Sequence, residues 1–200
     1  MGKRARKVLP LLGSILLIIS LFLPWWSATA RLPEGIGTAQ LTLYSFRFES
    51  SSFSCTTILL FYSYGTCPIL GSGSGVAMMA FYLFWALFFL ALSFCLGMVS
   101  TVTALKGYAR QFGWLPVASP VLNAFGNLSF VAAISTAGMK FVSGSALHGS
   151  SEVLDWAISF GFILAFTSTL VQLAHAYQAR RTGQNFNRSG AHCNGHISRR

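Results

Sequence analysis

Four long stretches without Asp, Glu, Lys or Arg are the feature that most limits the folds open to this 200-residue chain. A bilayer core of about 30 Å is crossed by about 20 apolar residues in a helix, and each stretch reaches that length. Across the chain 54% of the residues are hydrophobic and 9% are charged. Soluble domains carry roughly 25% charged residues. The sequence therefore predicts an integral membrane protein with helices over residues 8–28, 75–105, 115–139 and 156–177.

The distribution of charge predicts the side of the membrane on which each connection lies, because basic residues concentrate in cytoplasmic loops. With a cytoplasmic N-terminus, 11 Lys and Arg fall inside, whereas 3 fall outside together with all four acidic residues. A fifth span over residues 53–70 would reverse this bias, so four spans are favoured. The predicted location is a plasma or cell membrane. The expected order is a basic cytoplasmic N-terminus 1–7, an outer loop 29–74, a cytoplasmic loop 106–114, a short outer loop 140–155 and a basic, disordered cytoplasmic tail 178–200.

The N-terminal segment also has features of a secretory signal, because a basic start precedes an apolar run and Ala28-Thr29-Ala30 has the form of a cleavage site. The run from Val8 to Trp26 is 19 residues long. Since a signal core has about 7 to 15 residues, a retained helix is expected. Cleavage would leave three spans with the same orientation. Tryptophans at the edges of the spans are predicted interface anchors in the headgroup region, namely Trp25, Trp26, Trp114 and Trp156.

The large outer loop has the composition of β-structure. Residues 40–48 and 53–64 are rich in Thr, Tyr, Phe, Leu and Ile, with partial alternation, so we expect a small antiparallel sheet. Cys55 and Cys67 lie in this loop, on the side where disulfides persist. A hairpin centred near residue 61 would place them opposite each other. A structural disulfide is the prediction, and two free thiols or a redox-active pair are the alternatives.

These features together resemble the claudin and PMP22-like class of tetraspan membrane proteins. The shared outline is four spans, both ends inside, a Trp at the outer end of the first span, and a strand-rich first loop with two cysteines about a dozen residues apart. The Gly-Leu-Trp triplet of that family is absent before Cys55. The resemblance implies that Trp25 or Trp26, together with Cys55 and Cys67, stabilises the loop.

Inside the spans, polar and small residues predict how the helices pack. Asn123 and Asn127 are one turn apart on one face and too polar for contact with lipid, so we expect interhelical hydrogen bonds. A path for a polar substrate or an ion is the alternative. Two stripes of small residues recur every four positions and predict close helix contacts, namely Ser93, Gly97 and Thr101, and Gly161, Ala165 and Thr169.

Features of known catalytic and metal sites are sparse. No carboxylate lies inside a span, which argues against proton-coupled transport. His175 near the end of the fourth span is interpreted as an interfacial side chain. His192, Cys193 and His196 lie in a Gly- and Asn-rich tail and form a poor zinc site. We therefore predict no catalytic, cofactor-binding or metal-binding residues, and the basic excess is attributed to topology rather than to nucleic-acid binding.

The sequence favours an all-α membrane protein, a four-helix bundle with a small antiparallel β loop on its outer side. Its predicted role is that of a structural, adhesion or accessory protein that acts through contacts with lipid and with a membrane-protein partner or a second copy. The alternative is a membrane thiol-disulfide oxidoreductase in which outer-face cysteines pass electrons to a quinone. That alternative lacks a C-x-x-C motif and a second cysteine pair for the relay.

Overall fold

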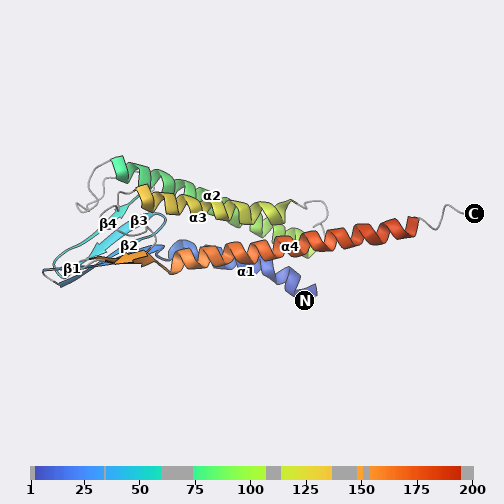
Figure 1. The fold of residues 1–200 in the computed structure, drawn as a ribbon, viewed down its shortest axis with the longest axis horizontal. Coiled ribbons are helices and arrows are strands. Elements are labelled where there is room, and N and C mark those ends of the chain that lie inside the picture. The colour runs from blue at the N-terminus through green and yellow to red at the C-terminus, as the bar shows by residue number, and fades with distance from the viewer. Residues whose placement is uncertain are drawn as a thin grey trace, which may run out of the picture.

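A computed structural model describes residues 3–33, 35–59, 74–106, 114–136, 148–150 and 154–194. Four helices run along one another and alternate in direction, with a sheet at one end of the bundle (Figure 1). The start of the first helix and the end of the last helix both lie toward the opposite end. The helices are α1 (Lys3–Phe22), α2 (Ser74–Lys106), α3 (Leu115–Thr136) and α4 (Phe160–Asn194).

Three of these helices are long and apolar enough to cross a membrane. Their outward side chains include large apolar groups such as Phe88 and Phe125, as expected for helices in contact with lipid. The apolar part of α1 is shorter and covers Val8–Phe22. Within the part of the chain that is described, the expectation of four full spans therefore holds for three. The candidate spans are Ala77–Thr103, Leu115–Ser135 and Phe160–Arg181.

The first helix ends earlier than the sequence analysis predicts, at Phe22 instead of residue 28. Pro24 has no N–H to donate, and its ring disfavours helical backbone at Leu23, so the helix stops there. From Trp26 onward apolar and polar residues alternate, as in a strand that is buried on one side. The apolar run thus divides into a helix and the first strand of the sheet.

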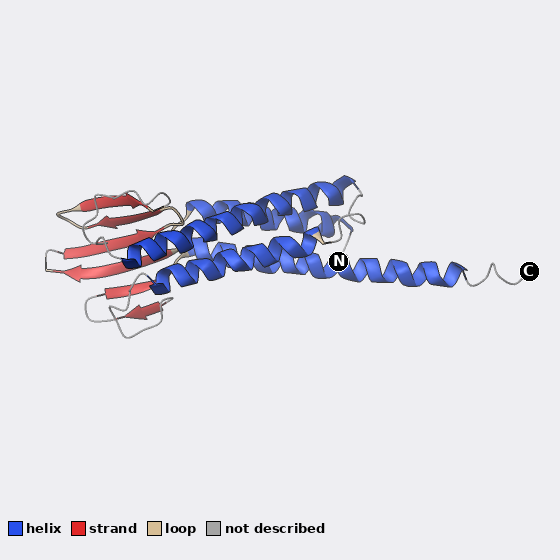
Figure 2. Ribbon diagram, turned by 90° about the horizontal axis from the view of Figure 1, so that it is seen from above, coloured by secondary structure: helices blue, strands red, loops and turns tan. Residues whose placement is uncertain are grey.

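The sheet has six antiparallel strands and is larger than the small loop sheet expected from the sequence. It lies across one end of the helices (Figure 2). The spatial order is β4-β3-β2-β1-β6-β5. Strand β1 therefore pairs on one side with β2, which follows it in the chain, and on the other side with β6, which comes just before the last helix. The strands are β1 (Trp26–Leu32), β2 (Gly35–Leu41), β3 (Ser45–Glu49), β4 (Ser54–Ile58), β5 (His148–Ser150) and β6 (Leu154–Ile158).

A tight turn divides the region that the sequence predicts as one strand over residues 40–48. The backbone N–H of Ser45 donates to Thr42 Oγ1 (2.9 Å), and the N–H of Thr42 donates to the carbonyl of Ser45 (2.8 Å). A threonine hydroxyl that bonds nearby backbone in this way favours a turn over a continuous strand. The segment therefore forms the end of β2 and the start of β3.

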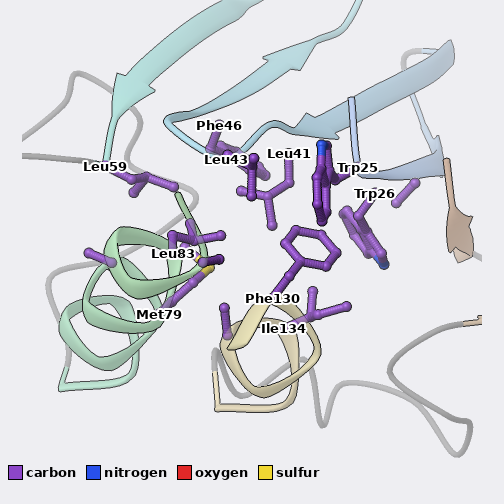
Figure 3. Packing of buried hydrophobic residues seen from close by; sticks show 14 of the residues in the cluster. Trp25, Trp26, Leu41, Leu43, Phe46, Leu59, Met79, Leu83, Phe130 and Ile134 are labelled. Carbon is purple, nitrogen blue, oxygen red and sulfur yellow. The ribbon is translucent and has the colours of Figure 1, made fainter. Parts of the chain in front are cut away.

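The main core lies where the sheet meets the helices. Figure 3 shows Leu41 and Leu43 pointing from the sheet side toward Leu83 on α2 and Phe130 on α3, with Trp25 above Phe130. All five side chains are fully buried. Because this cluster joins the sheet to two helices, the sheet is part of the same packed unit as the bundle.

The fourth helix differs from its predicted bounds at both ends. Trp156, predicted at the start of the span, lies in β6, and α4 begins at Phe160. At its other end α4 continues to Asn194, so the segment expected to be a disordered tail is helical over most of its length. Residues 137–147, which include the predicted end of the third span, lie outside the described residues.

Candidate functional site

A band of buried polar side chains runs through the middle of the helical bundle. Every helix contributes to it, and each member is at most 6% exposed. In an apolar setting such groups are stable when they bond to one another or to backbone. We call this set the polar band: Ser14, Ser93, Ser119, Asn123, Asn127, Ser168, Thr169 and Gln172.

Two serines in the polar band join α2 to α3. The hydroxyl of Ser93 donates to the carbonyl of Ser119 (2.8 Å). The Ser119 hydroxyl lies 2.9 Å from the carbonyl of Ser93 and 3.0 Å from Gln172 Oε1, and its single proton serves either acceptor. This pair of serines ties two helix backbones together and reaches α4 through Gln172.

The two asparagines lie between helices, where the sequence analysis expects them. Asn123 Nδ2 donates to Ser168 Oγ, and Asn127 Nδ2 donates to Thr169 Oγ1, both at 3.1 Å. Asn127 Nδ2 also lies 3.4 Å from Asn123 Oδ1. Within the described part of the chain Asn127 Oδ1 has no hydrogen-bond partner. The asparagines thus connect α3 to α4, and Asn127 does so through its amide nitrogen alone.

Ser168 extends the polar band to α1, because its hydroxyl donates to the carbonyl of Gly13 (2.8 Å). The helices approach closely here. A Cβ atom added to Gly13 would lie 2.8 Å from Gln172 Cγ, and one added to Gly97 would lie 2.7 Å from Ser14 Oγ. Glycine at both positions therefore allows the contacts between neighbouring helices that position the hydrogen bonds. Both small-residue stripes predicted from the sequence are buried.

Sequence reasoning found Asn123 and Asn127 and placed Ser93 and Thr169 in packing stripes. It missed the other members of the polar band, namely Ser14, Ser119, Ser168 and Gln172. Ser119, Asn123 and Asn127 are spaced by four residues, so they follow one face of α3. Ser168 and Gln172 show the same spacing on α4 and bond to that face. This spacing of polar groups was the signal that could have identified the polar band. It is a weak signal, because isolated serines are common in apolar helices.

Three of the four predicted interface tryptophans are buried in the protein instead of lying at the lipid boundary. Trp25 is 0% exposed, Trp26 3% and Trp156 7%. Trp25 Nε1 donates to the carbonyl of Ser20 (2.7 Å), and its ring meets Phe130 edge-on with centroids 4.9 Å apart. Because the helix ends at Phe22, these residues enter the sheet core, whereas Trp114 is 60% exposed.

The cysteines differ in their surroundings. Cys95 on α2 is a free, exposed thiol. Cys55 on β4 is buried opposite Phe48 and is not a free thiol. Its predicted partner Cys67 lies outside the described residues, so the pairing of Cys55 with Cys67 stays a prediction.

Within the described residues no group of three His, Cys, Asp or Glu side chains is placed to hold a metal ion. His175 on α4, which the sequence analysis interprets as interfacial, is 8% exposed, so its side chain is buried in the protein. The side chains of His192, Cys193 and His196 lie outside the described part of the chain. The arrangement that the structure does describe, neutral amides and hydroxyls bonded across four helices, suits the holding of helices in register.

No protein-family model matches this chain, and no curated protein sequence matches it. The resemblance to claudin and PMP22-like proteins therefore rests on the outline of the sequence and stays a prediction. The polar band and the sheet core are the features of this chain from which a function has to be argued.

Proposed function

We propose that the chain is an integral membrane protein with a structural, adhesion or accessory role, which presents the six-stranded sheet for contact with a membrane-protein partner or a second copy. The observation that carries this proposal is the attachment of the sheet to the bundle. A row of paired positions crosses five strands and faces the core, with Ala39 partly buried and the others buried: Trp156, Ala28, Ala39, Phe48 and Cys55. A sheet fixed in this way keeps one orientation relative to the membrane.

The opposite face of the sheet supports the same proposal. Neighbouring outward positions form a second row across four strands, namely Thr29, Thr38, Glu49 and Ser54, and all of these side chains are exposed. Within this row Glu49 forms an exposed ion pair with Arg47, which lies two positions earlier on the same strand. An ordered, polar surface of hydroxyls and mixed charge is suited to specific protein contacts, since it offers donors and acceptors at fixed spacing.

The orientation in the membrane is part of the proposal. The positive-inside bias supports a cytoplasmic location for both termini and an outer location for the sheet in a plasma or cell membrane. A disulfide between Cys55 and Cys67 would then form in an oxidising compartment, and the bonded state of Cys55 supports it.

Photo-cross-linking in native membranes tests the proposal. A photoreactive amino acid at Thr38 on the outer face of the sheet should give covalent adducts with protein. The matched control is Thr167, an exposed position on the membrane-spanning part of α4, where lipid adducts are expected instead. Protein adducts at Thr38 and none at Thr167 would support a contact role.

The contrary result is equally clear. If Thr38 and a second outer position, Thr56, give no protein adduct, the sheet is not a contact surface and the proposal is wrong. Purified protein that oxidises a dithiol while reducing a quinone would favour the oxidoreductase alternative. In that case mild thiols should readily reduce the bond at Cys55.

A further inference from the structure

The arrangement of the helices brings basic residues from three of them to one depth in the bundle. The starting point is the contact of Gly13 and Ser14 on α1 with Gly97, Ser119 and Gln172 on the other three helices, which we call the glycine contact. These groups touch one another, so they lie at the same depth. Distances along each helix can therefore be measured from the glycine contact.

Along the chain, α2 and α4 run away from the sheet toward the opposite end of the bundle (Figure 1). Lys106 is nine residues beyond Gly97 on α2, and Arg180 and Arg181 are eight and nine residues beyond Gln172 on α4. At 1.5 Å per residue, all three lie roughly 12 to 14 Å past the glycine contact. All three side chains are exposed.

The first helix brings further basic positions to the same depth. Its N-terminal end points away from the sheet, so the residues before Gly13 lie on the same side of the glycine contact as Lys106. The basic positions are six to ten residues before Gly13, which corresponds to roughly 9 to 15 Å. We call the whole set the basic collar: Lys3, Arg4, Arg6, Lys7, Lys106, Arg180 and Arg181.

Two observations place the basic collar at a membrane surface. Trp114, five residues before Ser119, lies about 7 Å past the glycine contact and is 60% exposed, as expected for an aromatic side chain at the headgroup region. Lys106 lies just after the candidate span Ala77–Thr103, and Arg180 and Arg181 are the last two residues of the candidate span Phe160–Arg181. The basic positions of the collar thus correspond to the height of lipid phosphates.

The collar has no acidic residue nearby in sequence. All four Asp and Glu lie between positions 34 and 155, in the two segments that carry strands. A set of basic positions at a similar depth, with no acidic residue nearby in sequence, attracts anionic groups, and each Lys or Arg near a charged membrane surface adds to that attraction. Arginine also binds phosphate oxygens through two parallel hydrogen bonds.

We propose that the basic collar binds the headgroups of anionic phospholipids and enriches them around the protein in the leaflet opposite the sheet. The partner is the lipid surface itself, recognised through its phosphates and its net negative charge. This inference does not depend on the proposed contact role of the sheet, because the collar and the sheet lie at opposite ends of the bundle.

The test uses the full-length protein in vesicles of equal parts phosphatidylglycerol and phosphatidylcholine. Spin-labelled forms of each lipid report which one contacts the protein. We expect wild type to favour the anionic lipid at least threefold at low salt, with the preference falling as salt rises. The R180Q/R181Q variant should reduce the preference at least twofold, and K106Q should reduce it by a smaller factor.

The matched control is R31Q/R47Q, which removes the same number of exposed charges at the sheet end and should leave the lipid preference unchanged. Inorganic phosphate at constant ionic strength should not compete, because the collar recognises a charged surface. Equal contact with both lipids, or an unchanged preference in both collar variants, would overturn the proposal. A wild-type protein without lipid preference whose collar binds soluble polyglutamate would overturn it in favour of an acidic protein partner.

Discussion

At the residue scale, the junction between α1 and β1 depends on one glycine on another helix. The N–H of Gly161 donates to the carbonyl of Pro24 (2.9 Å), and the N–H of Ser159 donates to the carbonyl of Trp25 (2.9 Å). The backbone just before β1 is thus bonded to the start of α4. Trp25 lies in this junction and contacts Phe162 on α4 edge-on, with centroids 5.8 Å apart.

Replacing Gly161 by Ala should disrupt this junction. The added Cβ would overlap with Trp25 Cδ1 and lie 2.8 Å from the carbonyl oxygens of Leu23 and Pro24. These oxygens are backbone atoms that cannot rotate away. Overpacking of this kind costs about 1 to 3 kcal/mol. We expect a lower unfolding temperature in detergent, followed by tryptophan fluorescence. Thr167→Ala on the exposed face of α4 is the control, and equal unfolding temperatures for both variants would contradict the role of Gly161.

What the sequence revealed at this scale depended on how local the signal was. Asn123 and Asn127 could be assigned to the interior because two amides one turn apart are informative on their own. The burial of Trp25 could not be inferred from its apolar run, which continues without a break from the helix into the strand. Pro24 and the alternation after Trp26 do indicate the boundary. The apolar run, however, is long enough to cross a bilayer, and this length favoured a single helix over the whole run.

At the element scale, the contact of α3 with α4 combines apolar packing with hydrogen bonds from the two asparagines. An interhelical hydrogen bond in a membrane protein contributes about 0.6 to 2 kcal/mol. Asn123 uses both its amide nitrogen and its oxygen, whereas Asn127 Oδ1 has no partner among the described residues. The two asparagines therefore differ in what their removal should cost.

Replacing both asparagines by Leu should weaken the bundle more than replacing Phe125, which is 52% exposed, by Ala. The double variant loses the bonds to Ser168 and Thr169 and leaves their hydroxyls with fewer partners. Of the single variants, Asn123→Leu should lower the unfolding temperature more than Asn127→Leu, because the latter also removes an unpartnered oxygen. Unfolding in mild detergent measures the order. A double variant as stable as wild type would contradict this account of the polar band.

The sheet shows why pairing between distant strands was not predictable. The strand character of β2, β3 and β4 follows from composition, and the turns between them are short. The pairing of β1 with β6 joins Trp26 to Ile158, positions more than a hundred residues apart, and no local pattern specifies such a partner. Asp155 and Trp156 do alternate between the outer and inner faces, but a strand of five residues carries too weak a signal to outweigh a predicted helix start.

Replacing Cys55 and Cys67 by Ser should loosen the sheet and leave the bundle inserted. Cys55 lies on β4, which is the last strand in the sheet order, so a bond to the following segment would restrain an edge of the sheet. We expect faster proteolysis between residues 31 and 74, with unchanged membrane extraction. The spans satisfy their own backbone hydrogen bonds and need no cross-link outside the membrane. Loss of insertion in the double variant, or proteolysis equal to that of wild type, would contradict this prediction.

At the scale of the whole molecule, the two ends of the bundle differ both in secondary structure and in charge. The sheet end holds the exposed ion pair of Arg47 and Glu49 and the segments with all four acidic residues. The other end holds the basic collar. Because α1 starts and α4 ends on the side away from the sheet, the positive-inside bias gives the same orientation for every helix.

Labelling with a membrane-impermeant maleimide in intact cells should therefore distinguish the two ends. In a background with all four cysteines replaced by Ser, a cysteine introduced at Thr38 on the outer face of the sheet should react in sealed cells. A cysteine introduced at Ser189, in the part of α4 that extends beyond the basic collar, should react only after the membrane is made permeable. Basic residues disfavour translocation, so the collar end should stay in the cytoplasm. If Ser189→Cys reacts in sealed cells while Thr38→Cys does not, the protein is inserted in the opposite orientation, and the outer placement of the sheet is wrong.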